Sequence, residues 1–384
     1  RDSSTSRGLG DVYKRQEVVK KISVPAENKI KQKQYIENGR LPVIDQGSKL
    51  IGGYSDDEEK IVKCNLPVIV FGDHTKCVKY VNFPFCAGAD GIKVLKPKDD
   101  CSEKYLYYLT KYVVLKIKDH GYARHYQYVE KEEVYIPSLN EQARIVSRIE
   151  EVFSELDKGV ETLQIIKEQL AVYRQAVLKM VFASMNERKP IKEVSSLVTS
   201  GSRGWAKYYS EEGVRFIRIT DLNRDKIKLK NNAIQHVLLP EEAEGKRSRL
   251  QGNDVLISIT ADLGSIALVP EDIEEAYINQ HIALVRFLNC HQGEFMAWYL
   301  KSDYGQKELL CNKRGGGKLG LGLDDIRNTS VPIVSDEVAD KVVSEIESRM
   351  SVCDSIEQTV NVALSQAEAM RQSILKKAFE GGLN

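Results

Sequence analysis

Apolar residues recur at intervals of three and four along residues 136–184, and this pattern predicts one long amphipathic helix with a coiled-coil-like seam. Pro137 stands just before the predicted helix at 138–184, and proline is tolerated at a helix entrance. At about 1.5 Å per residue, some 44 residues make a rod of roughly 66 Å, too long for the core of one compact domain. We interpret it as a spacer. The seam consists of Ile145, Ile149, Val152, Leu156, Val160, Leu163, Ile166, Leu170, Tyr173, Val177 and Val181.

The same pattern returns at the end of the chain, shifted by 197 positions. The second seam consists of Val342, Ile346, Met350, Cys353, Ile356, Val360, Ala363, Ala367, Met370 and Ile374. The shift also aligns five identical residues, namely Arg174, Gln175, Leu178, Lys179 and Phe182 with Arg371, Gln372, Leu375, Lys376 and Phe379. We therefore predict two half-repeats, each a globular region followed by a long helix.

In each globular region, short β-like runs, such as 66–71 and 92–95, alternate with turn residues and one shorter helix, which is expected after Ser102 in the first region and over residues 294–310 in the second. The fold class is therefore predicted as mixed α+β. Two similar α/β domains are separated by two long antiparallel helices in a pseudo-twofold internal repeat. The first 16 residues lack periodicity, and their end, DVYKRQ, resembles a translated sequencing adapter, so we set them apart from the fold as a non-native extension. The predicted segments are 1–16, domain 17–137, helix 138–184, domain 185–332 and helix 333–384.

Composition is ordinary for a soluble globular protein, with 42% hydrophobic residues and no apolar run near the ~18 residues of a membrane span. Seven scattered cysteines form no metal-ligand spacing and suit reduced thiols in a cytoplasm. Residues 17–137 hold 20 Lys and Arg against 17 Asp and Glu, and residues 185–332 hold 21 against 20. The two helical stretches hold 11 against 16. Mildly basic domains permit a nucleic-acid partner without requiring one.

Several motifs resemble catalytic ones, but the sequence around each does not suit catalysis. Residues 315–320, GGGKLG, fit a dinucleotide-binding pattern but follow a helix and open no βαβ unit. Leu319 stands where a phosphate-binding loop needs Ser or Thr. Pro240, Glu241 and Glu244 only faintly echo a nuclease metal site. The Asn-Pro-Pro-aromatic tetrapeptide of amino-methyltransferases is missing. We predict a chain without a catalytic centre or metal.

The run IPSLNEQARIVSRIEEVFSELD, its repeat and the two RQxxLKxxF tails resemble the specificity subunit of type I restriction–modification systems. In the repeat, Asp336 and Glu337 stand where the pattern has Glu-Gln. The resemblance implies two target recognition domains that bind a bipartite, asymmetric site on double-stranded DNA. It also implies docking of two methyltransferase (M) subunits and of restriction (R) subunits. S-adenosylmethionine, ATP and Mg are then expected on the partner subunits, and no cofactor on this chain.

Three other hypotheses stay open. The chain could be the specificity subunit of a related methyltransferase–nuclease system outside type I, distinguished by its partner genes. It could be a coiled-coil interaction protein with two ligand-binding heads, which would have no salt-sensitive affinity for DNA. It could be a single-chain enzyme such as a fused methyltransferase, which would bind S-adenosylmethionine tightly by itself.

Side chains that pair donors and acceptors with base edges, and cations that meet phosphates, are the candidate DNA contacts. In the first domain the candidates are Gln46, Lys49, His74, Lys76, Arg124, His125 and Gln127. In the second domain they are Arg203, Lys207, Asp221, Asn223, Gln280, His281, Lys313, Arg314 and Lys318. The repeated helix tails suggest one partner type that docks twice, so the candidate partner contacts are Arg174, Gln175, Arg371 and Gln372.

Overall fold

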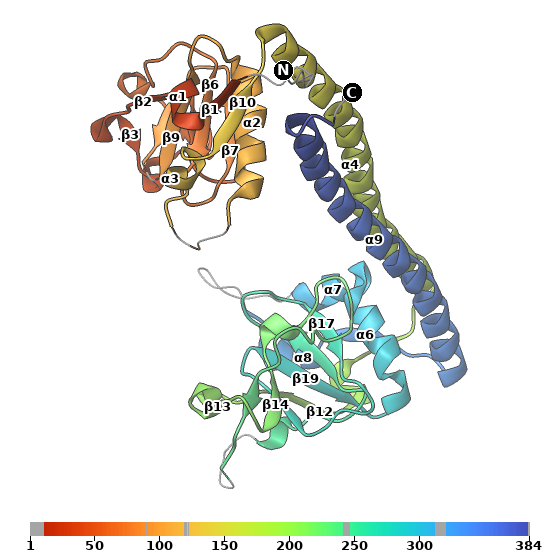
Figure 1. The fold of residues 1–384 in the computed structure, drawn as a ribbon. Helices are drawn as coiled ribbons and strands as arrows, with labels where there is room; N and C mark the ends of the chain where they lie inside the picture. Colours follow the sequence, from red (N-terminus) through yellow and green to blue (C-terminus); the bar gives the residue numbers. More distant parts are fainter. Residues whose placement is uncertain are drawn as a thin grey trace. The chain divides into compact units, whose positions relative to one another are not determined.

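A computed structural model describes residues 11–89, 91–118, 121, 123–240, 246–311 and 320–382. The chain forms two compact units. Unit 1 comprises Arg1–Leu163 with Val362–Asn384, and unit 2 comprises Gln164–Asn361. Both predicted long helices are present, α4 at Leu139–Phe182 and α9 at Asp336–Phe379, with 44 residues each. Each unit thus contains part of both helices, and within each unit the two lie side by side (Figure 1).

The buried face of the helix pair differs in detail from the predicted seam. In unit 1, Val146, Ile149 and Phe153 of α4 are buried with Leu375 of α9. In unit 2, by contrast, Tyr173 is 47% exposed although the periodicity places it in the seam. A straight helix has 3.6 residues per turn, so a seam predicted from 3.5-residue spacing drifts around it.

Unit 1 contains two four-stranded sheets. The first, in the order β2-β9-β6-β7, is antiparallel throughout and pairs β2 (Val19–Ile22), β9 (Ile92–Pro97), β6 (Val68–Gly72) and β7 (Val78–Val81). The second, in the order β3-β8-β4-β5, contains β3 (Lys29–Ile30), β8 (Cys86–Gly88), β4 (Leu41–Ile44) and β5 (Gly53–Ser55). The β-like runs predicted at 66–71 and 92–95 are therefore confirmed as β6 and β9.

The predicted helix after Ser102 is α2 (Glu103–Lys116), and the Ser102 side chain accepts a hydrogen bond from the backbone N–H of Tyr105. Leu106 and Leu109 of α2 are buried in one cluster with Ile69 of β6 and with the first part of α4. The core of unit 1 therefore joins the first sheet, α2 and the helix pair. A short helix, α3 (Tyr126–Val129), precedes β10 (Glu133–Ile136).

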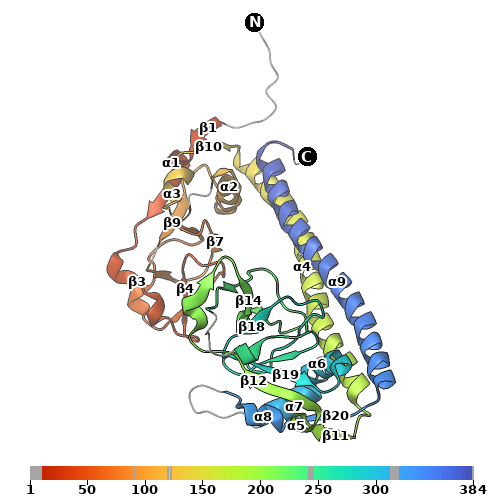
Figure 2. The same ribbon diagram turned by 90° about the horizontal axis from the view of Figure 1, so that it is seen from below.

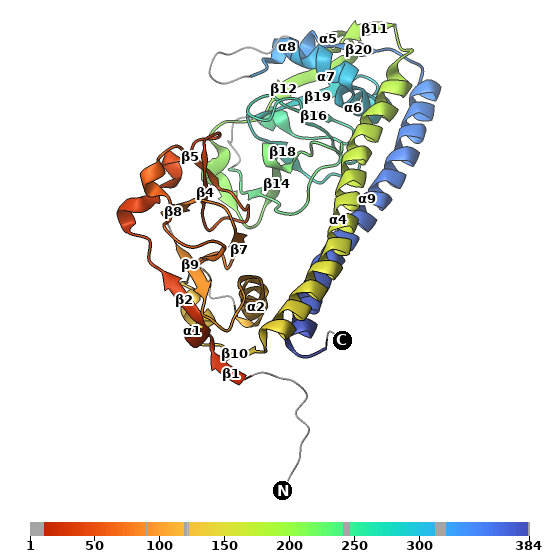
Figure 3. The same ribbon diagram turned by 90° about the horizontal axis from the view of Figure 1, so that it is seen from above.

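Unit 2 repeats this plan. Its first sheet, in the order β12-β19-β16-β17, is again antiparallel, and Figure 3 shows β12, β19 and β16 side by side. The strands are β12 (Ser195–Ser200), β19 (Ile282–Phe287), β16 (Val255–Ser258) and β17 (Ile266–Leu268). The second sheet, in the order β13-β15-β14-β18, contains β13 (Tyr209–Ser210), β15 (His236–Val237), β14 (Val214–Ile217) and β18 (Ala276–Ile278).

The helix predicted over residues 294–310 is interrupted. Its two parts are α6 (Gly293–Lys301) and α7 (Asp303–Leu310). Ser302 between them is extended, and its hydroxyl accepts a hydrogen bond from the backbone N–H of Gly305, which starts a new helix. A further short helix, α8 (Leu323–Arg327), takes the place of α3.

Each unit also closes with a small two-stranded sheet. In unit 1, β1 (Asp11–Lys14) pairs with β10 (Figure 2), and α1 (Arg15–Val18) follows. In unit 2, β11 (Arg188–Pro190) pairs with β20 (Ser330–Pro332), and α5 (Ile191–Val194) follows. Setting all of residues 1–16 apart from the fold was therefore wrong, because residues 11–14 gain backbone hydrogen bonds to β10.

Candidate nucleic-acid interface

Three segments of unit 1 meet at Asp73, directly after β6. The backbone N–H of Asp73 donates to the carbonyl of Gly91, which precedes β9, over 2.5 Å. The backbone N–H of His125, which precedes α3, donates to the carbonyl of Asp73 over 2.8 Å. We call Asp73, Gly91 and His125 junction 1. It brings loop residues from three distant parts of the domain to one end of the central strands.

Unit 2 builds the same junction from different residues. The backbone N–H of Ile259 donates to the carbonyl of His281 over 2.9 Å, and the N–H of Leu321 donates to Ile259 over 3.0 Å. Ile259, His281 and Leu321 form junction 2. The two hydrogen bonds match those of junction 1 one for one, so the backbone frame is shared while the side chains differ.

A pocket of about 330 Å³ opens at junction 1, lined by Lys29, Asp73, His74, Ala89, Gly91, Ile92, Lys93 and Arg124. The carboxylate of Asp73 is buried and already accepts a hydrogen bond from the backbone N–H of Tyr126 over 2.8 Å. Lys93 lies 3.7 Å from the same carboxylate. With Lys29 and Arg124 added, the pocket carries an excess of positive charge, which suits phosphate or the acceptor-rich edge of guanine.

Gly91 leaves the space that two neighbouring side chains occupy at this pocket. Its φ is +61°, a conformation that favours glycine. A Cβ at this position would stand 2.8 Å from the Gln46 amide oxygen and 2.8 Å from the His74 ring. The Nδ1 atom of His74 lies 3.2 Å from the carbonyl of Ala123, beside Arg124. The predicted residues Gln46, His74 and Arg124 are therefore brought together.

The other candidates of unit 1 divide into three groups. Lys49 and Gln127 are exposed but do not line the pocket, and Lys76 is half-buried with a φ of 60°. The assignment of His125 as a base reader is wrong, because its side chain is buried and its Nδ1 atom lies 3.0 Å from the Asp73 carbonyl. Lys29 and Lys93 were missed, since only tertiary structure brings two separate strands to one pocket.

At junction 2, two predicted residues form a chain of polar contacts. The Nδ1 atom of His281 lies 2.6 Å from the Thr260 hydroxyl, and its Nε2 atom lies 3.0 Å from the Gln280 amide nitrogen. The amide donates to Nε2, so the proton of the ring sits on Nδ1 and is donated to Thr260. This chain fixes the imidazole and the Gln280 amide in one orientation, as direct reading of a base edge requires.

The remaining candidates of unit 2 lie at varied places. Arg203 and Lys207 are exposed, and Arg203 follows Ser202, which pairs with Asn279 next to junction 2. The assignment of Asp221 as a base reader is wrong, because its carboxylate is buried and accepts a hydrogen bond from the backbone N–H of Arg218 over 2.8 Å. Asn223 likewise holds a loop, since its amide donates to the Lys228 carbonyl over 2.5 Å. Three further candidates lie outside the described residues: Lys313, Arg314 and Lys318.

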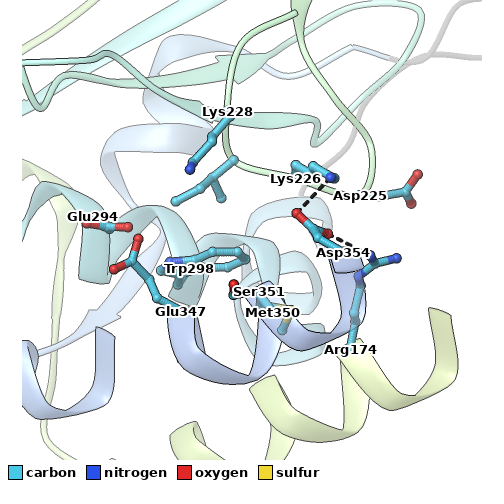
Figure 4. A pocket seen from close by; sticks show the side chains of 11 residues that line it. Arg174, Asp225, Lys226, Lys228, Glu294, Trp298, Glu347, Met350, Ser351 and Asp354 are labelled. Carbon is cyan, nitrogen blue, oxygen red and sulfur yellow. Dashed lines mark hydrogen bonds and ion pairs between the residues drawn. The ribbon is translucent and has the colours of Figure 1, made fainter. Parts of the chain in front are cut away.

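The candidate partner contacts lie on the two long helices. Arg174 is only 9% exposed, and its guanidinium donates to Asp354 on α9 over 2.8 Å (Figure 4). It also donates to Glu357 on α9 over 2.8 Å. In unit 1, Arg371 pairs with Asp157 and lies 5.4 Å from the centre of the Phe153 ring. The two arginines therefore hold the helix pair together, and the assignment of Arg174 as a partner contact is wrong because its side chain is buried. Gln372 is exposed, and Gln175 is half-buried.

Within the described residues, no group of three or more His, Cys, Asp or Glu side chains is arranged to hold a metal ion. Among the helices of the same part of the chain, none is both long and apolar enough to cross a membrane.

Comparison with known proteins gives consistent matches. The family model "Type I restriction modification DNA specificity domain" matches residues 11–167 and 186–366. The type I restriction enzyme EcoBI specificity subunit of Escherichia coli is 26% identical over 278 residues, covering 65% of this chain and 58% of that protein. The EcoKI specificity subunit of Escherichia coli (strain K12) is 26% identical over 269 residues, covering 65% and 57%. The chain thus matches less than two thirds of the length of these relatives.

Among solved structures, a chain from a study described as the structural basis underlying complex assembly and conformational transition of the type I R-M system is similar in fold. It has a TM-score of 0.69 at 16% identity and covers 99% of this chain and 100% of its own length. The mixed fold class predicted from the sequence is therefore confirmed.

Proposed function

The chain belongs to the type I restriction modification DNA specificity domain family, and we propose that it is the DNA-reading subunit of a type I restriction–modification complex. Besides family membership, one structural observation supports the proposal. Junction 1 and junction 2 share their backbone hydrogen bonds, yet one holds His74 and Arg124 and the other holds Thr260 and His281. A scaffold used twice with different polar side chains is what a reader of two unlike half-sites requires.

In this proposal, unit 1 reads one half-site mainly through Arg124, His74 and Gln46. Arg124 is exposed at the edge of a pocket rich in cations, and an arginine fork makes two hydrogen bonds to the O6 and N7 atoms of guanine. Lys29 and Lys93 would contact phosphates on either side. Unit 2 reads the other half-site through Gln280, with its amide oriented by His281.

The chain would act without catalysing a reaction. Methyltransferase subunits would supply the S-adenosylmethionine chemistry, and restriction subunits the ATP- and Mg-dependent cleavage, while this chain selects the sequence in the cytoplasm. The proposal rests on the lack of catalytic motifs in the sequence and on the names of the relatives, each a specificity subunit.

Methylation mapping in cells tests this proposal directly. The chain is expressed with its methyltransferase partner, and modified positions are compared for wild type, Arg124→Ala and Gln280→Ala. We expect Arg124→Ala to relax one position of one half-site, at a cost of about 1–3 kcal/mol in discrimination. Gln280→Ala should relax a position of the other half-site. Lys49→Ala serves as a charge-matched control for Arg124, because Lys49 is exposed outside the pocket. Relaxation of the same half-site by both variants would contradict two separate readers.

A further inference from the structure

The two units can be compared at the contact between the long helices and the short helix beside them. Phe379 in unit 1 packs on Tyr105 of α2 with ring centres 5.3 Å apart. Phe182, its counterpart under the 197-residue shift, packs on Phe295 of α6 with ring centres 5.6 Å apart. Tyr105 and Phe295 therefore occupy equivalent places. By the same alignment Lys104 corresponds to Glu294, and Tyr108 corresponds to Trp298.

In unit 1, a lysine of the chain itself supplies a cation at this contact. The ammonium group of Lys104 lies 2.8 Å from the carboxylate of Glu150 on α4. The Tyr108 ring lies beside this pair and packs edge-on against Phe153, with ring centres 5.9 Å apart. A carboxylate, an aromatic ring and an ammonium group thus meet at a partly exposed contact between α2 and the long helix.

Unit 2 keeps the carboxylate and the aromatic ring but replaces the cation by a second acid. Glu347 on α9 is the counterpart of Glu150, and Glu294 stands where Lys104 stands in unit 1. Burial and the neighbouring Glu347 together raise the pKa of Glu294 to about 7. Among the described residues, neither carboxylate has a cation within ion-pair distance.

A pocket of about 350 Å³ opens at this place, and we call it the α6–α9 pocket. Figure 4 shows Glu294 and Glu347 close together at one side, next to Trp298. Trp298 is 7% exposed, and its buried indole N–H meets no hydrogen-bond partner within the described part of the chain, although it lies near enough to Glu294 to lower the pKa of that carboxyl. The pocket is lined by Arg174, Asp225, Lys226, Ile227, Lys228, Glu294, Trp298, Glu347, Met350, Ser351 and Asp354.

The cations of the pocket wall do not neutralise the acid pair. Lys226 lies 2.8 Å from Asp354, which also binds Arg174, so both cations are engaged at the other side of the pocket. Lys228 is exposed on its loop and lowers the pKa of Glu294, but burial and Glu347 outweigh it. When Glu294 is ionised, the side that contains Glu294 and Glu347 therefore lacks one positive charge, the charge that Lys104 supplies in unit 1.

We propose that the α6–α9 pocket binds a lysine or arginine side chain of a protein partner, with its cation between Glu294 and Glu347 and beside the Trp298 ring. Unit 1 demonstrates the chemistry, because Lys104 makes the equivalent contact within the chain. A cation beside two carboxylates forms charge-assisted hydrogen bonds, and the indole ring adds a cation–π attraction. The protein source of the cation rests on the proposed function, since such a subunit works within a complex.

The binding test uses the full chain and capped arginine (N-acetyl-arginine amide) as the probe. The chain has two tryptophans, so its indole N–H signals in nuclear magnetic resonance spectra are few, and a Trp298→Phe variant identifies the signal of Trp298. We expect a saturable shift of that signal, stronger at pH 8 than at pH 6, because the raised pKa of about 7 keeps much of Glu294 protonated and uncharged at pH 6. Glu294→Lys should abolish the shift and raise the melting temperature, because it restores the arrangement of unit 1. Glu368→Lys, an exposed residue of α9 outside the pocket, is the charge-matched control and should keep the shift.

Three outcomes would overturn the proposal. They are no shift with capped arginine, a shift that persists in Glu294→Lys, and a shift with MgCl₂ but none with capped arginine, which would indicate a metal site. A second arm addresses the protein source in cells where the chain directs methylation. Glu294→Lys should lower the extent of methylation several-fold and leave the target sequence unchanged, whereas unchanged extent would contradict a protein partner. A changed target would instead implicate DNA reading, which separates this inference from the proposed function.

Discussion

Arg174 on α4 donates to Asp354 on α9 over 2.8 Å, and the residues 197 positions away repeat the contact as Arg371 with Asp157. The second arginine is the counterpart of the first, and Asp354 is the counterpart of Asp157. The same acid–base pair therefore joins the long helices once in each unit, with the roles of the two helices exchanged. The repeated arginine is thus explained by an internal contact used twice.

This relationship predicts unequal effects on stability. Arg174→Ala should lower the free energy of unfolding by about 1–3 kcal/mol, because it removes hydrogen bonds between charged groups at a mostly buried site. Arg371→Ala should cost only about 0.2–1 kcal/mol, because that side chain is more exposed. Urea unfolding monitored by circular dichroism measures both, with the exposed Lys179→Ala as control. Equal losses for the two arginines would contradict this explanation.

The burial of Arg15 predicts that its replacement by an apolar residue raises the stability of the fold. Its side chain is fully buried, its Nη2 atom donates to Thr110 over 2.6 Å, and its Nε and Nη1 atoms have no hydrogen-bond partner among the residues that the structure describes. In unit 2 the first residue of the equivalent short helix is Ile191, which is also fully buried. Arg15→Ile should therefore raise the stability by about 1–3 kcal/mol, since buried, unpaired polar atoms cost about that much. Thermal unfolding measures the change, and the exposed Lys20→Ile should show no such gain.

The surroundings of Gly91 predict that its substitution weakens DNA recognition, and that this effect can be separated from a loss of stability. Gly91→Ala has two costs, one from its positive φ and one from a Cβ that meets Gln46 and His74. Gly121→Ala is the matched control, since its φ is +63° and no atom of the other described residues lies within 4 Å of the Cβ that the substitution adds. Both variants should lose about 1–2 kcal/mol of stability from the backbone conformation. Only Gly91→Ala should weaken recognition of one half-site, and an equal weakening by Gly121→Ala would show that the pocket plays no part.

The acid pair of unit 2 predicts a pH dependence of stability. The pKa of Glu294 is raised to about 7 in the folded chain, above its value of about 4.3 when unfolded. As the pH rises through this window, the unfolded chain releases a proton that the folded chain retains, so stability falls with increasing pH. The groups that act on Glu294 are Glu347, Lys228 and the Trp298 indole. Glu294→Gln should reduce this fall between pH 5 and pH 8, as measured by melting temperature, while Glu368→Gln should leave it unchanged.

The sequence predicted the long helices well because a 3.6-residue period is a local property of the chain. The sequence did not reveal that Arg174 makes an internal contact, because its carboxylate partners, Asp354 and Glu357, lie about 180 positions away in the chain. It also could not distinguish Arg124 from its neighbour His125, because only the junction shows that the ring of His125 turns inward to Asp73.

The pocket of unit 1 illustrates the same limit. Gln46, His74 and Arg124 could be selected by residue type alone, but Lys29 and Lys93 join them through the pairing of strands far apart in the chain. Residue type suggests which side chains can read a base, and tertiary structure decides which of them converge.

Replacement of residues 17–137 by the matching region of a relative with a different DNA target tests the central claim most directly. Methylation mapping by long-read sequencing, in cells that also express the methyltransferase partner, reports both half-sites of every modified target at once. Because each unit builds its own junction from its own side chains, the hybrid should acquire the half-site of the donor and retain the other half-site unchanged. A hybrid that is active but altered in both half-sites, or in neither, would contradict two independent readers on one repeated scaffold.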